Sequence, residues 1–247
     1  MKTSFAFVHP LSLAALSLSF AAAGCGGGEP PKPVESPTVE APPKRPEGPK
    51  PQMSQELGSI DEAATNATFT KVSSDLNACY KDGRKHLAFL SGDVKFFLRI
   101  TEAGTVKYEM LEGSTLGDRA TELCMMEALR KAEWPKPVGG EAEVRKSFGF
   151  DPPSNVRAPV AWEGDKLAEP LSKIEKDIHK CKKGSNATFT ATAHVHPDGK
   201  HGKIEHVGIV ASTREGELVV DCLVDELKDM KGIPSPGSYP AKVTFTL

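Results

Sequence analysis

The stretch Gly92–Phe150, GDVKFFLRITEAGTVKYEMLEGSTLGDRATELCMMEALRKAEWPKPVGGEAEVRKSFGF, decides the fold of this chain. Apolar side chains alternate along its opening segment, which predicts a strand with one buried face that runs to a turn at Gly104. A second strand, a helix that carries Cys124, a Pro-x-Pro turn and a final strand follow. The alternating residues are Val94, Phe96, Leu98 and Ile100. The stretch therefore predicts a β-β-α-β unit.

The same order of elements recurs between Ala187 and Leu247. Phe189, Ala191, Ala193 and Val195 alternate along the new first strand, which ends at a Pro-Asp-Gly turn. The distance from the Ser-Thr pair to the helix cysteine is the same in both copies, Ser114 to Cys124 and Ser212 to Cys222. Equal spacing at this point is the clearest sign of duplication. In each copy the Ser-Thr pair is expected to cap the helix.

A helix is predicted before each unit. Ser59 and Glu62 form a capping-box pattern, and a helix that ends near Lys81 would carry Cys79 on its apolar face. In the second half the apolar residues step by four, three, four and three, at Leu167, Leu171, Ile174, Ile178 and Cys181. The sequence thus predicts an α+β protein with two tandem α-β-β-α-β domains, residues 59–152 and 166–247, joined by a linker at 153–165.

The N-terminal region has the features of a secretory signal. Residues 1–24 contain an early lysine, an apolar run and the small residues Ala22-Ala23-Gly24. The cysteine that follows, Cys25, resembles the acylated cysteine of the bacterial lipobox, and the alternative is an ordinary signal with a chance cysteine. Residues 25–58 are rich in proline and charge, which predicts a disordered tether. We therefore expect a lipid-anchored envelope protein that faces the periplasm, with the outer membrane favoured over the inner.

Four further cysteines remain after Cys25. Each copy has one at the end of its first helix and one within its second. This symmetry favours disulfides between Cys79 and Cys124 and between Cys181 and Cys222 over the other two pairings. Buried free thiols are the alternative, and a redox-active pair is disfavoured because the chain has no Cys-x-x-Cys motif.

Histidines cluster on the predicted second hairpin. A Zn²⁺, Cu²⁺ or Ni²⁺ site built from His194, His196 and His206 is geometrically conceivable. No carboxylate or thiolate is placed in the sequence to complete the shell, and His206 aligns with Tyr108 of the first copy. We therefore expect solvated strand histidines, and neither a metal nor another cofactor.

Composition and motifs narrow the classes of function. The formal charge of -2 and the 6% aromatic content disfavour nucleic acid as a partner. The chain contains no P-loop, nucleophile elbow, zinc-protease helix or dinucleotide fingerprint, and its acids are scattered. A protein without catalytic activity is the expectation.

The motifs of the first copy resemble the AgmX/PglI-type C-terminal domain of bacterial envelope proteins and, more distantly, are similar to the TonB C-terminal fold. The residues that carry the resemblance are Gly92 to Phe96, Gly104 to Val106, Gly113 to Leu116, Cys124 and Trp134 to Gly140. The second copy departs from the pattern, with Arg214 in place of Leu116 and Ile233 in place of Trp134. The resemblance implies the fold and an envelope location, and it implies no defined activity.

These inferences predict a tethered binding or scaffold module for an envelope protein or for peptidoglycan. An exposed sheet edge is the expected binding surface, with the strand Val243–Leu247 as the candidate for strand addition. The first alternative is a receptor that binds a metal or small ligand through the histidine hairpin. The second is a hydrolase or transferase with a site in the groove between the copies.

Overall fold

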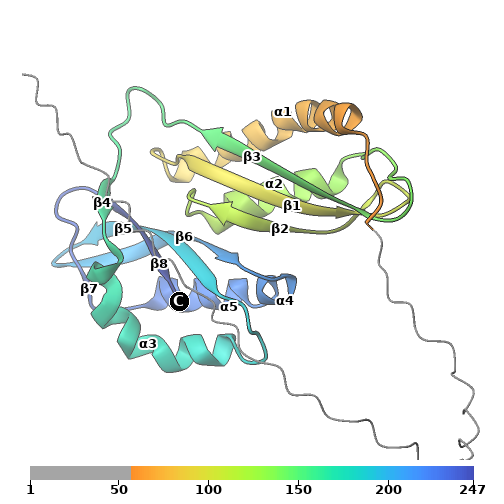
Figure 1. Ribbon diagram of the computed structural model, residues 1–247. Coiled ribbons are helices and arrows are strands. Elements are labelled where there is room, and N and C mark those ends of the chain that lie inside the picture. Colours follow the sequence, from red (N-terminus) through yellow and green to blue (C-terminus); the bar gives the residue numbers. More distant parts are fainter. Residues whose placement is uncertain (1–56) are drawn as a thin grey trace, which may run out of the picture. The chain divides into compact units, whose positions relative to one another are not determined.

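The computed structural model describes residues 57–247 (Figure 1). The predicted signal peptide, Cys25 and residues 26–56 of the predicted tether lie outside the described part. Helices and strands are both abundant in residues 57–247, so the α+β class is confirmed. None of the helices in this part of the chain is both long and apolar enough to cross a membrane.

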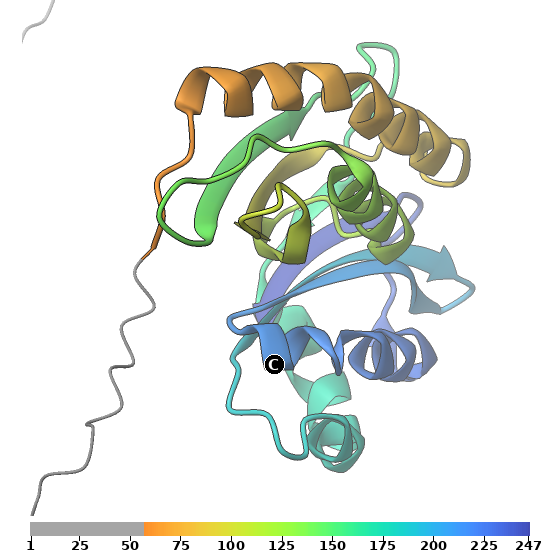
Figure 2. The same cartoon turned by 90° about the vertical axis from the view of Figure 1, so that its right-hand side faces the viewer.

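The first half contains the five predicted elements in the predicted order, and we call it repeat 1. They are α1 (Glu62–His86), β1 (Gly92–Ile100), β2 (Val106–Ser114), α2 (Arg119–Lys131) and β3 (Ala142–Phe150). The three strands form an antiparallel sheet, sheet 1, in the order β2-β1-β3. In Figures 1 and 2, α1 runs across one face of this sheet.

The second half, repeat 2, has the same scheme with additions. Its elements are β4 (Val160–Trp162), the 3-10 helix η1 (Gly164–Leu167), α3 (Ala168–Cys181), β5 (Phe189–Asp198), β6 (His201–Ala211), α4 (Arg214–Glu217), α5 (Val220–Asp229), β7 (Ile233–Pro234) and β8 (Ala241–Thr246). Sheet 2 has the order β4-β8-β5-β6-β7. The segment predicted as a linker therefore supplies a strand.

The strand β4 also corrects the expected binding edge. It pairs in parallel with Ala241, Lys242 and Val243 of β8, while β5 pairs with the other side of β8. The expectation that Val243–Leu247 forms an open edge strand is therefore wrong at Val243, the residue of this stretch that pairs with β4. In sheet 1, β3 pairs only with β1 among residues 57–247, so its outer edge is free of strand partners there.

The boundaries of the first helix differ from the prediction. The Oδ1 atom of Asp61 accepts a hydrogen bond from the N–H of Ala64 at 2.6 Å, so Asp61 rather than Ser59 caps α1. The backbone of Ser59 instead pairs with Val138, which holds this residue extended. The helix continues to His86, past the expected end near Lys81, and its last turn is basic, which complements the helix dipole.

The predicted Ser-Thr caps are wrong for both cysteine-bearing helices, and α5 of repeat 2 begins at the N-cap Val219 without a side-chain hydrogen bond. In repeat 2, Thr213 caps α4, because its hydroxyl accepts from the N–H of Gly216 at 3.1 Å. In repeat 1 the cap of α2 is Asp118, whose carboxylate accepts from the N–H of Thr121. Ser114 is free to donate to Glu122 instead, at 2.5 Å. The Ser-Thr pairs therefore have the same spacing to the cysteine in both repeats, but their hydroxyl groups have different hydrogen-bond partners.

Each repeat has its own hydrophobic core between sheet and helices. The inward residues of β1 and of β5 are fully buried, as the alternation predicts. One disulfide joins α1 to α2 in repeat 1, Cys79 to Cys124, and one joins α3 to α5 in repeat 2, Cys181 to Cys222, with Cα atoms 5.8 and 5.7 Å apart. These are the two pairs that the symmetry of the sequence favours.

The two repeats also contact each other. Strand β6 lies against β2 and against the start of α2. Gly117, in the loop before α2, has φ +74°, and a Cβ at this position would lie 2.9 Å from the Thr192 carbonyl oxygen. Only glycine combines this backbone conformation with so close an approach. The outward face of sheet 2 is thus partly covered by repeat 1.

Candidate functional site

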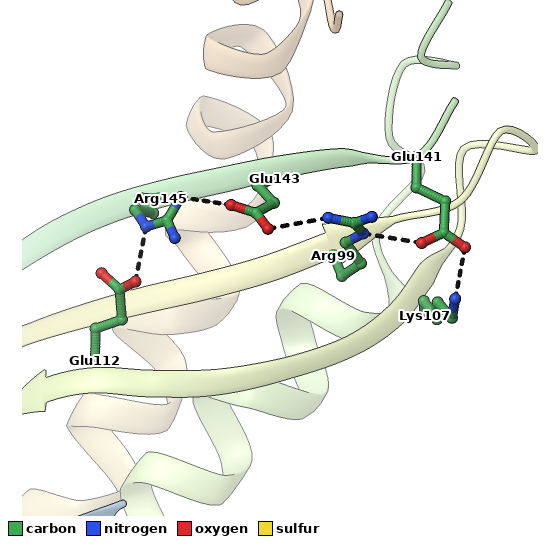
Figure 3. Close-up of polar contacts among 6 residues, drawn as sticks. All are labelled: Arg99, Lys107, Glu112, Glu141, Glu143 and Arg145. Carbon is green, nitrogen blue, oxygen red and sulfur yellow. Dashed lines mark hydrogen bonds and ion pairs between the residues drawn. The ribbon is translucent and has the colours of Figure 1, made fainter. Parts of the chain in front are cut away.

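A continuous row of ion pairs crosses the face of sheet 1 that is turned away from its hydrophobic core. The row, which we call the ion-pair row, consists of Lys107, Glu141, Arg99, Glu143, Arg145, Glu112 and Lys95. Figure 3 shows six of these side chains, which reach across all three strands of the sheet. Four cations and three carboxylates alternate, so every carboxylate lies between two cations.

The contacts within the row are short. Arg99 bridges two carboxylates, with 2.9 Å from Nε to Glu141 and 2.9 Å from Nη1 to Glu143. Arg145 continues the row, with 3.1 Å to Glu143 and 2.7 Å to Glu112. The ends of the row are Lys107 on Glu141, at 2.7 Å, and Lys95 on Glu112, at 2.9 Å. Several charges in one network hold one another in place better than an isolated surface pair does.

Two β-bulges in β2 bring Lys107 and Glu112 onto this face. In β2, Leu111 and Gly113 pair with the successive residues Phe96 and Lys95, so Glu112 is an extra residue. Lys107 is extra in the same way between Val106 and Tyr108. An inserted residue changes the side to which the following side chains point. The bulges explain why strict alternation along β2 fails to place Lys107 and Glu112.

The network lowers the pKa of the carboxylates Glu112 and Glu141. Hydrogen bonds from Lys107 and Arg99 lower the pKa of Glu141. Burial raises the pKa of Glu112, but hydrogen bonds from Lys95 and Arg145 outweigh burial and leave this pKa below its ordinary value. The pKa of Arg99 is raised chiefly by its hydrogen bond with Glu141. A carboxylate in this state is suited to bind cations and N–H donors rather than to exchange protons near neutral pH.

Part of the ion-pair row, from Glu143 to Lys95, lines one wall of a groove of about 790 Å³, within the size range of ligand pockets. We call it the inter-repeat groove. Its sheet 1 wall consists of Lys95, Phe97, Tyr108, Met110, Glu112, Glu143 and Arg145, and its repeat 2 wall of Thr188, Thr190, Val210, Ala211, Ser212, Arg214 and Glu215. One wall is therefore charged and aromatic, and the other is largely small and hydroxyl-bearing.

An aromatic pair lies at the base of the charged wall. The rings of Phe97 and Tyr108 stack with centroids 5.7 Å apart. The guanidinium of Arg145 lies 4.6 Å from the Phe97 ring and that of Arg214 lies 4.7 Å from the Tyr108 ring. Such cation–π contacts orient both guanidinium groups. Arg145 belongs to repeat 1 and Arg214 to repeat 2, so both repeats supply cations to the groove.

The predicted histidines lie where the repeats meet, and the expectation that they are solvated is wrong for His194. This side chain is completely buried, and its Nε2 lies 2.8 Å from the carbonyl oxygen of Leu116, to which it donates. Burial lowers the pKa of His194 to about 4, so the ring is neutral at pH 7. The ring of Phe89 from repeat 1 packs against His194 and His196, with centroids 5.5 and 5.8 Å away.

The other two histidines have carboxylate neighbours that the sequence did not place. His206 Nδ1 lies 2.9 Å from Asp118 Oδ1, and His196 Nδ1 lies 3.4 Å from Glu205 Oε2. Residues 57–247 contain no group of three or more His, Cys, Asp or Glu side chains arranged to hold a metal ion. Nε2 of His194 and Nδ1 of His206 are engaged in contacts between the repeats, and Nδ1 of His196 faces Glu205, so the geometry does not favour a receptor based on these three histidines.

Glu122 is the buried charge that sequence reasoning missed. It lies on α2 with no exposed surface, and its carboxyl group packs against Gly208 of β6, where a Cβ would lie 2.4 Å away. Its Oε1 accepts from Ser114, while Oε2 has no hydrogen-bond partner in the described part of the chain. Burial raises the pKa of Glu122 to about 7. The position of Glu122 on α2 did not predict its burial, because the strand that covers it, β6, belongs to the other repeat.

A second ion-pair bridge crosses between the repeats next to Glu122. Arg119 is buried, and its Nη1 lies 2.7 Å from Glu217 of α4 while its Nε lies 2.8 Å from Asp221 of α5. Burial opposes the charge of Arg119, but the two carboxylates outweigh it and raise the pKa of the guanidinium. The bridge and the Asp118–His206 pair therefore join the start of α2 to repeat 2.

Comparison with protein-family models, with curated proteins and with solved structures gives no match for this chain. The resemblance to the AgmX/PglI-type and TonB C-terminal domains therefore depends on the motifs in the sequence. Cys25, the predicted lipid attachment site, lies outside the described residues. The inter-repeat groove is the candidate functional site within the described residues.

Proposed function

We propose that this chain is a lipoprotein of the bacterial cell envelope, without catalytic activity, that binds a protein or cell-wall partner through the inter-repeat groove. The repeats act as TonB C-terminal-like modules, and the Pro-rich segment holds them away from a membrane to which Cys25 is anchored by acylation. The protein faces the periplasm, with the outer membrane favoured. The groove with its ion-pair row is the observation that carries the proposal.

The chemistry of the groove supports binding rather than catalysis. The groove carboxylates Glu112 and Glu143 are paired with cations, and the lowered pKa of Glu112 keeps this side chain ionised. Fixed charges of both signs select partners by electrostatic complementarity and increase the rate of association. The two disulfides are suited to an oxidising compartment such as the periplasm.

A polypeptide partner suits the position of the groove. Strand β3 has an edge free of strand partners within residues 57–247, and it carries Glu143 and Arg145 of the groove wall. A segment that adds to this edge would obtain main-chain hydrogen bonds, and every second side chain would point toward the charged wall. The proposal thus moves strand addition from β8, where β4 lies, to β3.

Site-specific photo-crosslinking in intact cells tests the groove. A photoreactive amino acid replaces Thr190, which is exposed on the repeat 2 wall, and a matched variant carries it at Glu127, which is exposed on α2 outside the groove. We expect a discrete adduct from position 190 and none from position 127. The same adduct from both positions, or no adduct from position 190, would refute binding in the groove.

Charge reversal separates the groove from the membrane anchor. Arg145→Glu should abolish the adduct at position 190, because it places a third carboxylate between Glu112 and Glu143. Lys131→Glu, on the exposed end of α2, is the matched control and should leave the adduct unchanged. Cys25→Ala should release the protein from the membrane fraction. If the Cys25→Ala variant stays in that fraction, the proposed acylation of Cys25 is refuted, while the proposed binding in the groove is judged by the adduct alone.

A further inference from the structure

A second groove lies in repeat 2, between α3 and the end of β8, and it does not share residues with the inter-repeat groove. It has a volume of about 410 Å³ and is lined by Ala168, Leu171, Ser172, Glu175, Ile178, His179, Lys182, Thr246 and Leu247. We call it the α3 groove. Its interior is formed by Leu171, Ile178 and Leu247, and its volume lies in the range of small-molecule sites.

The corresponding place in repeat 1 is filled by aromatic side chains. Phe69 precedes Cys79 by the same ten positions that separate Leu171 from Cys181. The Phe69 ring packs against Phe148, with centroids 5.9 Å apart, and Phe69 is only 3% exposed. In repeat 2 the smaller Leu171 is only partly buried. The two repeats thus differ at one equivalent position: Phe69 fills the space beside the helix in repeat 1, and the smaller Leu171 leaves a groove there in repeat 2.

The partner of Phe69 is also replaced by a smaller residue. Phe148 faces Val94, the first buried residue of β1, and Leu247 donates its N–H to the carbonyl of Phe189, the first buried residue of β5. Leu247 therefore takes the place of Phe148. Two leucines in the positions of two phenylalanines account for the open space.

The α3 groove leads into a basic hollow at the end of the helix. The hollow, of about 570 Å³, is lined by Lys176, His179, Lys180, Lys182, Lys183, Gly184 and Ser185, and it shares His179 and Lys182 with the groove. Lys180 is paired with Asp177 at 2.6 Å. Lys176, Lys182 and Lys183 form no ion pair within the described part of the chain. Glu175 is the one carboxylate side chain among the residues that line either space.

We infer that the α3 groove and the basic hollow together bind a lipid molecule with a single acyl chain and an anionic head group. The chain contacts Leu171, Ile178 and Leu247, and burial of its methylenes supplies the affinity. The head group lies in the hollow, where lysine ammonium groups complement its charge. Repeat 2 is thereby a ligand-binding module, whereas the aromatic contact closes the same place in repeat 1.

Titration of the purified full chain with dodecyl phosphate, below its micelle concentration, tests the inference by calorimetry. We expect saturable binding, and no binding of inorganic phosphate or of dodecyltrimethylammonium at the same concentrations. Equal binding of inorganic phosphate would show an anion site without a chain, and would overturn the inference. Binding only to vesicles of phosphatidylglycerol, and not to monomeric dodecyl phosphate, would also overturn it by showing a basic surface rather than a groove.

Two variants place the ligand. Leu171→Phe introduces the side chain that repeat 1 has at the equivalent position, and it should weaken dodecyl phosphate binding at least about tenfold. Leu218→Phe is the control, because Leu218 is 83% exposed in the connection between α4 and α5 and lines neither the α3 groove nor the basic hollow. Unchanged binding by a folded Leu171→Phe variant would refute the site.

The charge of the hollow gives an independent test should Leu171→Phe fail to fold. The double variant Lys182→Gln and Lys183→Gln should bind dodecyl phosphate roughly fivefold to tenfold more weakly, in line with the modest value of exposed charge pairs. Lys85→Gln, on α1, should leave the affinity unchanged. Equal affinity of the double variant and the wild type would overturn the role of the hollow.

Discussion

Glu122→Gln should remove a large part of the pH dependence of stability. Glu122 is fully buried between α2 and β6, and it has no cation within hydrogen-bonding distance. Desolvation raises its pKa from the ordinary 4.5 to about 7. The folded state therefore favours the protonated form, and glutamine reproduces the neutral shape without a titrating proton.

The magnitude follows from the pKa. One pKa unit corresponds to about 1.36 kcal/mol, so ionisation of Glu122 costs the folded state about 3 kcal/mol in total. Because the folded pKa is raised, the stabilisation is complete below pH 4.5 and is lost as the pH rises through about 7. Between pH 5 and pH 8.5 the wild type should lose about 2.5 kcal/mol of unfolding free energy from this group.

Urea unfolding with the disulfides intact measures the effect at pH 5, 6, 7 and 8.5. The quantity of interest is the difference in unfolding free energy between wild type and Glu122→Gln at each pH. Taking this difference removes the contributions of other groups, including His194, whose low pKa acts in the opposite direction. Glu127→Gln, on the exposed face of the same helix, serves as the control and should give a flat difference.

The expected difference changes by about 2.5 kcal/mol in favour of the glutamine variant as the pH rises from 5 to 8.5. Any constant offset reports the packing of the amide group and does not bear on the argument. A difference that stays flat across this range would refute the reasoning, because it would show that Glu122 ionises as easily in the folded chain as in the unfolded chain.

Three further predictions concern the contacts between and within the repeats. Gly117→Ala should lower the unfolding free energy by roughly 1–3 kcal/mol and by more than Gly139→Ala, because both have positive φ but only Gly117 has neighbours within 4 Å; equal melting temperatures of the two variants would contradict this. His194→Gln should reduce the loss of stability as the pH falls from 6.5 to 4, since the folded pKa of about 4 makes protonation of His194 costly; unfolding curves at the two pH values, with the same loss in both proteins, would count against it. Reduction of the Cys79–Cys124 bond should cost about 4 kcal/mol by the chain-entropy model for a separation of 45 residues; unfolding of a double serine variant without a change in midpoint would disprove this.

Much of the local structure was predictable because it depends on neighbours along the chain. The alternation of β1 placed Phe96 and Leu98 in the core and Arg99 on the opposite face. The errors at the helix starts have a local cause too, since Ser59 and Asp61 are both acceptable caps and the pairing of Ser59 with Val138 decides between them. Strand β4 was missed because a segment of three residues has too little pattern to be recognised.

The candidate site was less predictable. Alternation suggested that Arg99 and Lys95 share a face, but the β-bulges that add Lys107 and Glu112 depend on pairing between strands. The two groove walls come from segments far apart in the sequence, such as those of Phe97 and Thr188. His194 was expected in solvent for the same reason, because the alternation of β5 shows that it points away from its own core but not that repeat 1 covers it.

The sequence by itself determined the class of fold, the order of elements in the first repeat and the cysteine pairs. These features follow from periodicity and spacing, which are properties of short segments and of their repetition. The tertiary structure alone decided which polar residues became buried, which carboxylates found cations and where the grooves opened. Burial and ion pairing depend on the residues that other segments bring near, and one repeat cannot specify what packs against its outer face.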